Sequence, residues 1–305
     1  MHTTVADVFP DAEVAPPQPT EAMLRAAGAG QRAGDGMLRV ERVRGRSVVV
    51  RARANSPMKL LTPRPKSGDG ATAHAVVSGY GGGLVSGDHL RLRLDVGDAA
   101  RCRLGTQAST KVYKRLPHGR ASRQTLEATV GRDAVLAVAP DPVTCFAGAA
   151  YEQSQRIDLH ESSSLLLIDW LTSGRWAGGE RWAFDLYRSR TEATVAGRRV
   201  LLDALRLDPS DGPIAAPHRC GRFNCIATVV LLGPAFAAAS EALLARVAGE
   251  PLARQAPLLA AASPIGGGAV LRVMGGGAEP VGQYIGDRLA RAAEVLGVPL
   301  FDRKW

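Results

Sequence analysis

The stretch LRLRLDVGDAARCRL, residues 90–104, decides the fold of this 305-residue chain. Its first half alternates apolar and charged residues, which predicts a β-strand with one buried and one exposed face. Gly97-Asp98 then predicts a turn, and an extended pattern resumes from Ala100 to Leu104. We therefore expect two short strands joined by a tight turn.

The same pattern occurs twice more downstream. Residues 126–139 contain a strand, a turn at Gly131 and a second strand, and residues 155–171 repeat this order around His160. The three turns are 34 and 29 residues apart, which indicates a weak internal repeat. A hairpin with one apolar face is stable only when it stacks on its neighbours. The sequence therefore predicts a mainly β fold of layered, stacked antiparallel hairpins that resembles a β-solenoid.

The two ends of the chain differ from this repeated part. Residues 1–36 are rich in Ala, Pro and Gly and show no periodicity, which predicts a flexible tail. Helical spacing of apolar residues appears only late, over 236–248 and 281–296. We expect one β-rich domain over residues 37–305 with about two C-terminal helices.

Composition excludes several classes of protein. The net charge is +9, but 33 of the 38 basic residues are Arg and they are spread along the whole chain, without the basic and aromatic blocks of a nucleic-acid binder. Four cysteines are too few for a secreted disulfide framework. No secretory signal and no long apolar stretch is visible. We expect a cytoplasmic protein that binds neither nucleic acid nor membrane.

Polar residues follow the second strand of each repeated unit. Stacking the units would bring these ends together, so that hydroxyls, amides and carboxylates gather at one edge of the fold. Such oxygen ligands suit a hard or borderline cation that is held only transiently. The residues concerned are Thr106, Gln107, Ser109, Thr110, Asp141, Thr144, Cys145 and Glu180.

Three other features each allow two interpretations. The glycine run at 79–83 fits a phosphate loop or a close approach of two backbone segments, and no helix is expected after it. His218, Cys220 and Cys225 fit metal ligands or packed side chains. Asp88 and Glu180 fit the acid and base of a β-solenoid-like carbohydrate lyase or hydrolase, or two caps of turns.

Several motifs resemble one known family. GGLVSGD at 82–88 and TQASTKVY at 106–113 are similar to signatures of the UreD-type, or UreH-type, urease accessory proteins. The resemblance continues in order through PDPVTCF at 140–146, YEQ at 151–153, DWLTSGR at 169–175 and GER at 179–181. It covers residues 37–305.

The resemblance implies a non-enzymatic maturation factor with a β-rich fold and a few helices. It implies a complex with a helical UreF-type partner and a nickel-carrying UreG-type GTPase, which together act on the urease apoprotein in a higher-order hetero-oligomer. It also implies an internal channel for nickel, the transient cargo.

Oxygen ligands that exchange readily would let nickel move on, whereas Cys and His cages would trap it. Lys111 is cationic and would repel the ion, so we expect it to pair with an acid instead. The residues expected along the nickel path are Asp88, Thr106, Gln107, Ser109, Thr110, Asp141 and Glu180.

Overall fold

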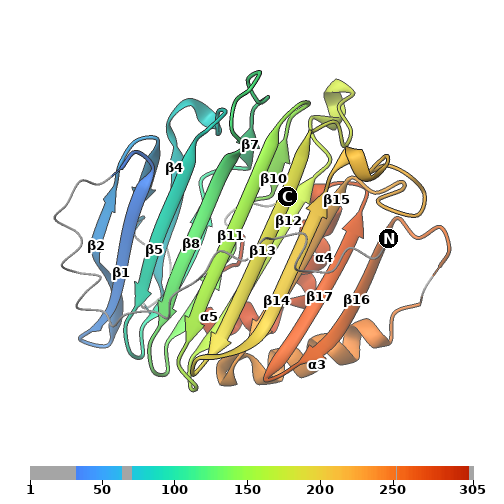
Figure 1. The fold of residues 1–305 in the computed structure, drawn as a ribbon. Coiled ribbons are helices and arrows are strands. Elements are labelled where there is room, and N and C mark those ends of the chain that lie inside the picture. Colours follow the sequence, from blue (N-terminus) through green and yellow to red (C-terminus); the bar gives the residue numbers. More distant parts are fainter. Residues whose placement is uncertain (1–31, 64–70, 252, 302–305) are drawn as a thin grey trace.

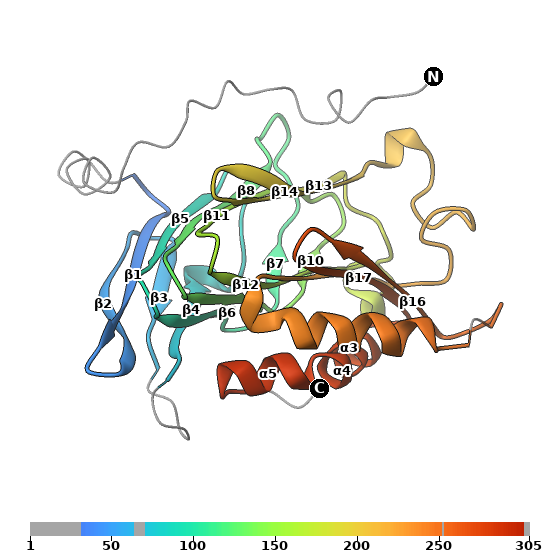
Figure 2. The same cartoon turned by 90° about the horizontal axis from the view of Figure 1, so that it is seen from below.

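Two β-sheets face each other, and helices cover the outer face of one of them (Figures 1 and 2). This description comes from a computed structural model and concerns residues 32–63, 71–251 and 253–301. Most of the predicted tail, residues 1–31, lies outside this range, and the first strand begins at Asp35. The expected mainly β fold with C-terminal helices is confirmed.

Sheet A has seven strands in the order β14-β13-β11-β8-β5-β1-β2. Its five central strands run parallel, and the hairpins β1–β2 and β13–β14 close its two edges. The strands are β1 (Asp35–Val43), β2 (Arg46–Ala54), β5 (His89–Val96), β8 (Ser122–Val130), β11 (Ala150–Leu159), β13 (Leu186–Val195) and β14 (Arg198–Leu207).

Sheet B has ten strands, eight of them in the order β16-β17-β15-β12-β9-β6-β4-β3, with β10 beside β12 and β7 beside β10. The strands are β3 (Met58–Leu61), β4 (Ala73–Gly79), β6 (Arg101–Thr106), β7 (Thr110–Val112), β9 (Val135–Val138), β10 (Val143–Cys145), β12 (Ser164–Thr172), β15 (Cys225–Leu232), β16 (Leu258–Ile265) and β17 (Gly268–Gly275).

The repeated units stack, but they are not hairpins. The two strands of each unit lie in different sheets and pair in parallel with the matching strands of the next unit, as Leu92 does with Leu126 and Cys102 with Leu136. The first strand of each unit alternates buried and more exposed residues, whereas the second strands β9 and β12 are largely apolar on both faces. Because the two strands need different surroundings, they belong to different layers. The finer expectation of a β-solenoid is not confirmed.

The C-terminal helices form a layer on sheet B (Figure 2). They are α3 (Ala237–Ala248), α4 (Ala278–Arg288) and α5 (Ala290–Leu296). The second predicted helix is split, because the chain leaves helical geometry at Leu289, where ψ is 12°. Phe236, Leu243 and Ile285 pack in a core against the outward-facing side chains of sheet B. A second core fills the space between the sheets.

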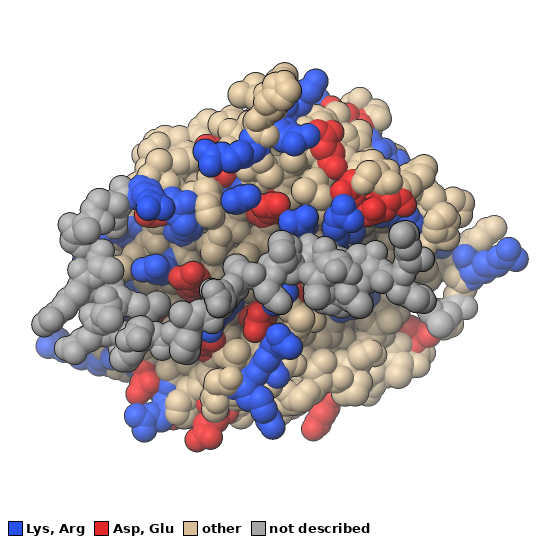
Figure 3. Space-filling model, viewed as in Figure 1, with Lys and Arg blue, Asp and Glu red and all other residues tan. Residues whose placement is uncertain are grey.

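The outer face of sheet A is covered with charges of both signs (Figure 3). Neighbouring strands pair these charges, for example Arg93 with Glu127 at 3.3 Å and Arg123 with Glu152 at 2.8 Å. Exposed pairs of this kind contribute little to stability, and the mixed signs do not form the basic surface that nucleic acid requires. Most of the basic residues on this face therefore have local partners.

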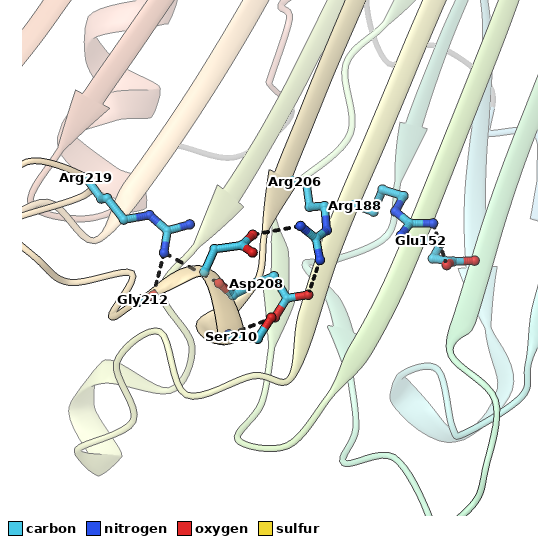
Figure 4. A network of polar contacts seen from close by, with 8 residues as sticks. Glu152, Arg188, Arg206, Asp208, Ser210, Gly212 and Arg219 are labelled. Carbon is cyan, nitrogen blue, oxygen red and sulfur yellow. Dashed lines mark hydrogen bonds and ion pairs between the residues drawn. The ribbon is translucent and has the colours of Figure 1, made fainter. Parts of the chain in front are cut away.

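One such network fixes the loop that leaves β14 (Figure 4). Arg206 binds Asp208 at 2.6 Å and Asp211 at 2.7 Å, and Arg219 donates to the carbonyl of Gly212. The loop is thus held against the edge of sheet A by contacts within itself and to β14.

Candidate functional site

The polar ends of three repeated units meet, as the sequence predicts. Asp141 accepts a hydrogen bond from the Thr106 hydroxyl at 3.2 Å, and its own backbone N–H donates to that hydroxyl oxygen at 2.8 Å. Val143 of β10 pairs with Thr110 of β7 on one side and with Leu171 of β12 on the other. The short strands β7 and β10 therefore join the ends of neighbouring units into one edge.

An outer hollow of about 320 Å³ lies between this edge and the glycine run. Gln107 is held there by its backbone bond to Val77 at 3.0 Å and by the Ser78 hydroxyl, which donates to its side-chain oxygen at 2.5 Å. Polar and charged residues that line the hollow include Ser78, Thr106, Gln107, Ser109, Thr110, Lys111 and Gln124.

An inner cavity of about 100 Å³ lies between the two sheets. A water molecule needs about 10–15 Å³ of such volume, so the cavity has room for several. Asp141 lines the inner cavity but not the outer hollow. The two spaces adjoin, because both are lined by Val77, Leu90, Thr106, Thr110 and Gln124.

The inner face of sheet A supplies the polar wall of this cavity. Gln124, Gln153 and Gln155 occupy positions of β8 and β11 where the period-two pattern predicts apolar side chains. The Tyr151 hydroxyl contacts the side-chain oxygens of Gln124 and, at 3.0 Å, Gln153. These glutamines were missed from the sequence, although their break in the apolar alternation was a usable signal.

Asp169 faces this wall from sheet B. Its carboxylate accepts a hydrogen bond from the Ser189 hydroxyl at 2.7 Å, and the Gln153 amide donates to Ser189 at 3.3 Å. The residue lines the inner cavity, which accounts for its partial exposure. Burial among protein atoms raises the pKa of Asp169, and hydrogen bonds from Ser189 and Gln153 offset part of that rise. Sequence reasoning missed this residue as a site residue.

Asp88 and Glu180 lie outside both spaces and are fixed locally. The Asp88 carboxylate accepts from the backbone N–H of Val85 at 2.9 Å, so it caps the turn before β5. Glu180 accepts from Arg175 Nε at 3.0 Å and from the Ala147 N–H at 3.2 Å. The hydrogen bond from Arg175 lowers the pKa of Glu180. Since the two acids do not converge on one cavity, the carbohydrate lyase or hydrolase is not favoured.

The structure also shows the surroundings of the glycine run, of Lys111 and of the group His218, Cys220 and Cys225. Gly83 allows a close approach, because a Cβ there would lie 2.7 Å from the Lys111 carbonyl oxygen. Lys111 is exposed and has no ion pair among the described residues, so its predicted acid partner is not found there. Burial raises the pKa of the Cys225 thiol to about 12, and His218 is exposed. Within the described ranges no three His, Cys, Asp or Glu side chains group as metal ligands.

Fold and site together define a β protein of two facing sheets, with a cavity between the sheets and an adjoining hollow at one end. A family model described as UreD urease accessory protein matches residues 32–305. Proteins named urease accessory protein UreD are 50% identical in Sorangium cellulosum, over 90% of this chain and 85% of that one, and 46% identical in an Anaeromyxobacter species, over 90% of both.

A urease accessory protein D from Oryza sativa is 43% identical over 68% of each chain. The chain belongs to the UreD family of urease accessory proteins, and its function is that of a urease accessory protein. No helix in the described part of the chain is long and apolar enough to cross a membrane.

Proposed function

We propose that this protein is a non-enzymatic scaffold that joins the urease apoprotein to UreF-type and UreG-type partners and conducts nickel toward the urease active site. The observation that carries the proposal is that the outer hollow and the inner cavity lie on either side of the same five lining residues. A route between them needs oxygen ligands that do not trap the ion.

Apolar side chains form most of the lining of the inner cavity, and oxygen-bearing side chains stand among them. Thr106 and Thr110 supply hydroxyls at the junction of the two spaces, and Gln107 and Ser109 supply an amide and a hydroxyl in the outer hollow. Asp141 and Asp169 supply the carboxylates of the inner cavity. Such oxygen ligands bind Ni²⁺ more weakly than thiolate or imidazole and exchange more readily. Nickel would therefore be held briefly at each step.

Asp88 and Glu180 are expected to contribute less to nickel binding along this route than the sequence suggested. Neither residue lines the hollow or the cavity, and both carboxylates accept local hydrogen bonds, so their expected contribution is to hold their loops rather than to bind the ion. The expected order of effects on nickel passage is therefore Asp141 and Asp169 first, and Asp88 and Glu180 after them.

The experiment is activation of urease in cells that co-express the apoprotein with this chain and its accessory partners. We expect Asp141→Asn and Thr106→Val to lower urease activity and nickel content per urease at least several-fold, because Thr106 lines both spaces and Asp141, its hydrogen-bond partner, lines the inner cavity. The matched control is Glu127→Gln, which removes a charge from the outer face of sheet A.

Assembly is measured in the same cells by co-purification of the accessory complex and urease. Reduced activation with intact assembly supports conduction through the cavity. Full activation by both lining variants, or reduced activation by Asp88→Ala alone, would place the route elsewhere and overturn this assignment.

A further inference from the structure

The hairpin β1–β2 closes one edge of sheet A and carries a concentrated positive charge (Figure 1). We call residues 42–53 the basic hairpin. This stretch contains no Asp or Glu and five arginines, which are Arg42, Arg44, Arg46, Arg51 and Arg53. All of them except the half-buried Arg51 are exposed, and none has an ion pair within the described ranges.

The hairpin at the opposite edge of sheet A has its charges balanced locally. On β14, Arg206 pairs with Asp208 at 2.6 Å and with Asp211 at 2.7 Å. Arg199 of the same strand lies 3.9 Å from the Glu192 carboxylate. The two edges therefore differ, because no carboxylate in the described part of the chain balances the arginines of the basic hairpin.

Arginines and a valine of the basic hairpin share the outer face of sheet A. Val40 of β1 is 0% exposed, so the residues on either side of it face away from the core. Residues directly opposite each other in an antiparallel pair share a face. The outward-facing residues of β1 lie opposite Arg46, Val48, Arg51 and Arg53. Val48 is 42% exposed and the nearby Val50 is 51% exposed, so cations and apolar groups lie along one open strip.

The strip runs along an open edge of the sheet. β2 is the last strand of sheet A and pairs only with β1 among the described strands. An exposed edge with β-branched side chains can pair with another extended segment. A second copy of this chain is a poor occupant, because it would place arginine against arginine. The strip suits an extended segment that carries both carboxylates and apolar side chains.

The sequence of the chain itself contains such a segment. Residues 1–24 have four carboxylates and no Lys or Arg. The stretch TTVADVFPDAEV, residues 3–14, combines three acids with three valines and a phenylalanine, and we call it the acidic segment. Its carboxylates complement the arginines of the basic hairpin, and its apolar side chains complement the exposed valines. A phosphate-bearing partner would supply the charge without the apolar groups.

The described chain begins beside β2, which places the acidic segment within reach. Asn55 directly follows β2, and its side-chain amide donates to the carbonyl of Arg32 at 3.2 Å. A strand of nine residues, such as β2, is about 30 Å long. The residues between Val14 and Arg32 span more than about 50 Å when extended. A tether of this length gives an effective concentration on the order of 1 mM, which favours this segment over a separate protein of the same chemistry.

We propose that the acidic segment docks on the basic hairpin, with its carboxylates on the arginines and its apolar side chains on Val48 and Val50. Docked there, the segment covers the open edge of sheet A. It thereby prevents a second copy or another chain from pairing with β2. The contact is partly electrostatic, so added salt weakens it.

The experiment is hydrogen exchange of the full chain, read by mass spectrometry on peptides from the acidic segment and from β2. Both regions should exchange about tenfold or more slowly in wild type than in variants that separate them. Asp7→Arg with Glu13→Arg should remove the protection from both regions, and so should Arg46→Glu with Arg53→Glu. Combining the two charge reversals should restore it, because the signs match again.

The matched control comes from the hairpin at the opposite edge of sheet A. Arg198→Glu with Arg199→Glu reverses two exposed arginines there and should leave the exchange of both regions unchanged. Peptides from β8 and β11, in the middle of the same sheet, are followed in the same spectra. Their unchanged slow exchange shows that a variant has kept its fold.

An acidic segment that exchanges like a free peptide in wild type would overturn the proposal, and so would protection that survives reversal of the hairpin charges. Protection of β2 that grows with protein concentration would assign the edge to a second copy. Protection of β2 that requires added heparin and ignores reversal of the acidic segment would assign it to an external polyanion. Either assignment would overturn the choice of the acidic segment as occupant.

Discussion

The space between the two sheets has a polar half and an apolar half, and the same strands build both. On β11 and β13 the first inner residues are the buried Tyr151 and Tyr187. Polar inner side chains follow on β8, β11 and β13, and the inner side chains near the strand ends are apolar. The polar set is Gln124, Gln153, Gln155, Ser189 and Thr191, and the apolar set is Ala128, Val130, Ile157, Leu159, Ala193 and Val195. Register is continuous through both halves, so backbone pairing does not distinguish them.

The difference shows which half holds the sheets together. Ile157 is 0% exposed and belongs to the core that joins both sheets, whereas Gln153 lines the cavity. Burial of apolar surface drives the association of the layers. The polar half can keep an open cavity because the apolar half and the ladder of parallel strands already fix the separation of the sheets.

The largest expected effect comes from truncating a side chain in the apolar half. Ile157→Ala should lower the free energy of unfolding by about 3 kcal/mol, because it removes buried methyl groups and leaves a void. Gln153→Ala should cost only about 1 kcal/mol, because a cavity is already present and one hydrogen-bonded side chain is lost. Urea unfolding of the full chain measures both. Equal losses would contradict the division into two halves.

A smaller effect, dependent on pH, is expected for Asp169→Asn in the polar half. Burial raises the pKa of Asp169 above that of an unfolded Asp, so the folded state keeps a proton that the unfolded state releases. The stability from this residue is complete below the unfolded pKa and is lost as pH rises through the folded pKa.

The comparison of wild type with Asp169→Asn isolates this contribution. Asn keeps an acceptor for the Ser189 hydroxyl but has no proton to lose. The variant should gain stability relative to wild type as the pH is raised from 4 to 8, measured by thermal unfolding at each pH. A difference that does not change with pH would show that Asp169 titrates normally.

Much of the fold was predictable because its signals are local. The alternating residues 90–96 and the Ala- and Leu-rich 237–248 each form the expected element. The pairing of strands was not predictable in the same way, since a tight turn at Gly97 fits a hairpin and a crossing between layers equally. The doubly apolar second strands were the signal that favoured the crossing. Strand β16 was missed because Ala-rich LLAAASPI has weak β propensity.

The grouping of polar residues at one edge was predictable in part for a similar reason. Thr106, Thr110 and Asp141 follow strands whose stacking brings their ends together, so position along the chain was enough to group them. Asp169 lies within an apolar strand that is buried on both faces, so no periodicity indicates which layer its side chain faces. The positions of the Asp88 and Glu180 carboxylates depend on hydrogen bonds within and between loops, which spacing along the sequence does not reveal.

The smallest effect is expected on the outer face of sheet A, which is a third environment beside the two halves of the space between the sheets. Glu127 pairs with Arg93 at 3.3 Å on the outer face of sheet A, where both side chains are about half exposed. Water and salt screen such a pair, so Glu127→Gln should change the free energy of unfolding by less than about 0.5 kcal/mol. A larger change, measured in the same unfolding series, would mean that the outer charges contribute to stability as the buried carboxylate does.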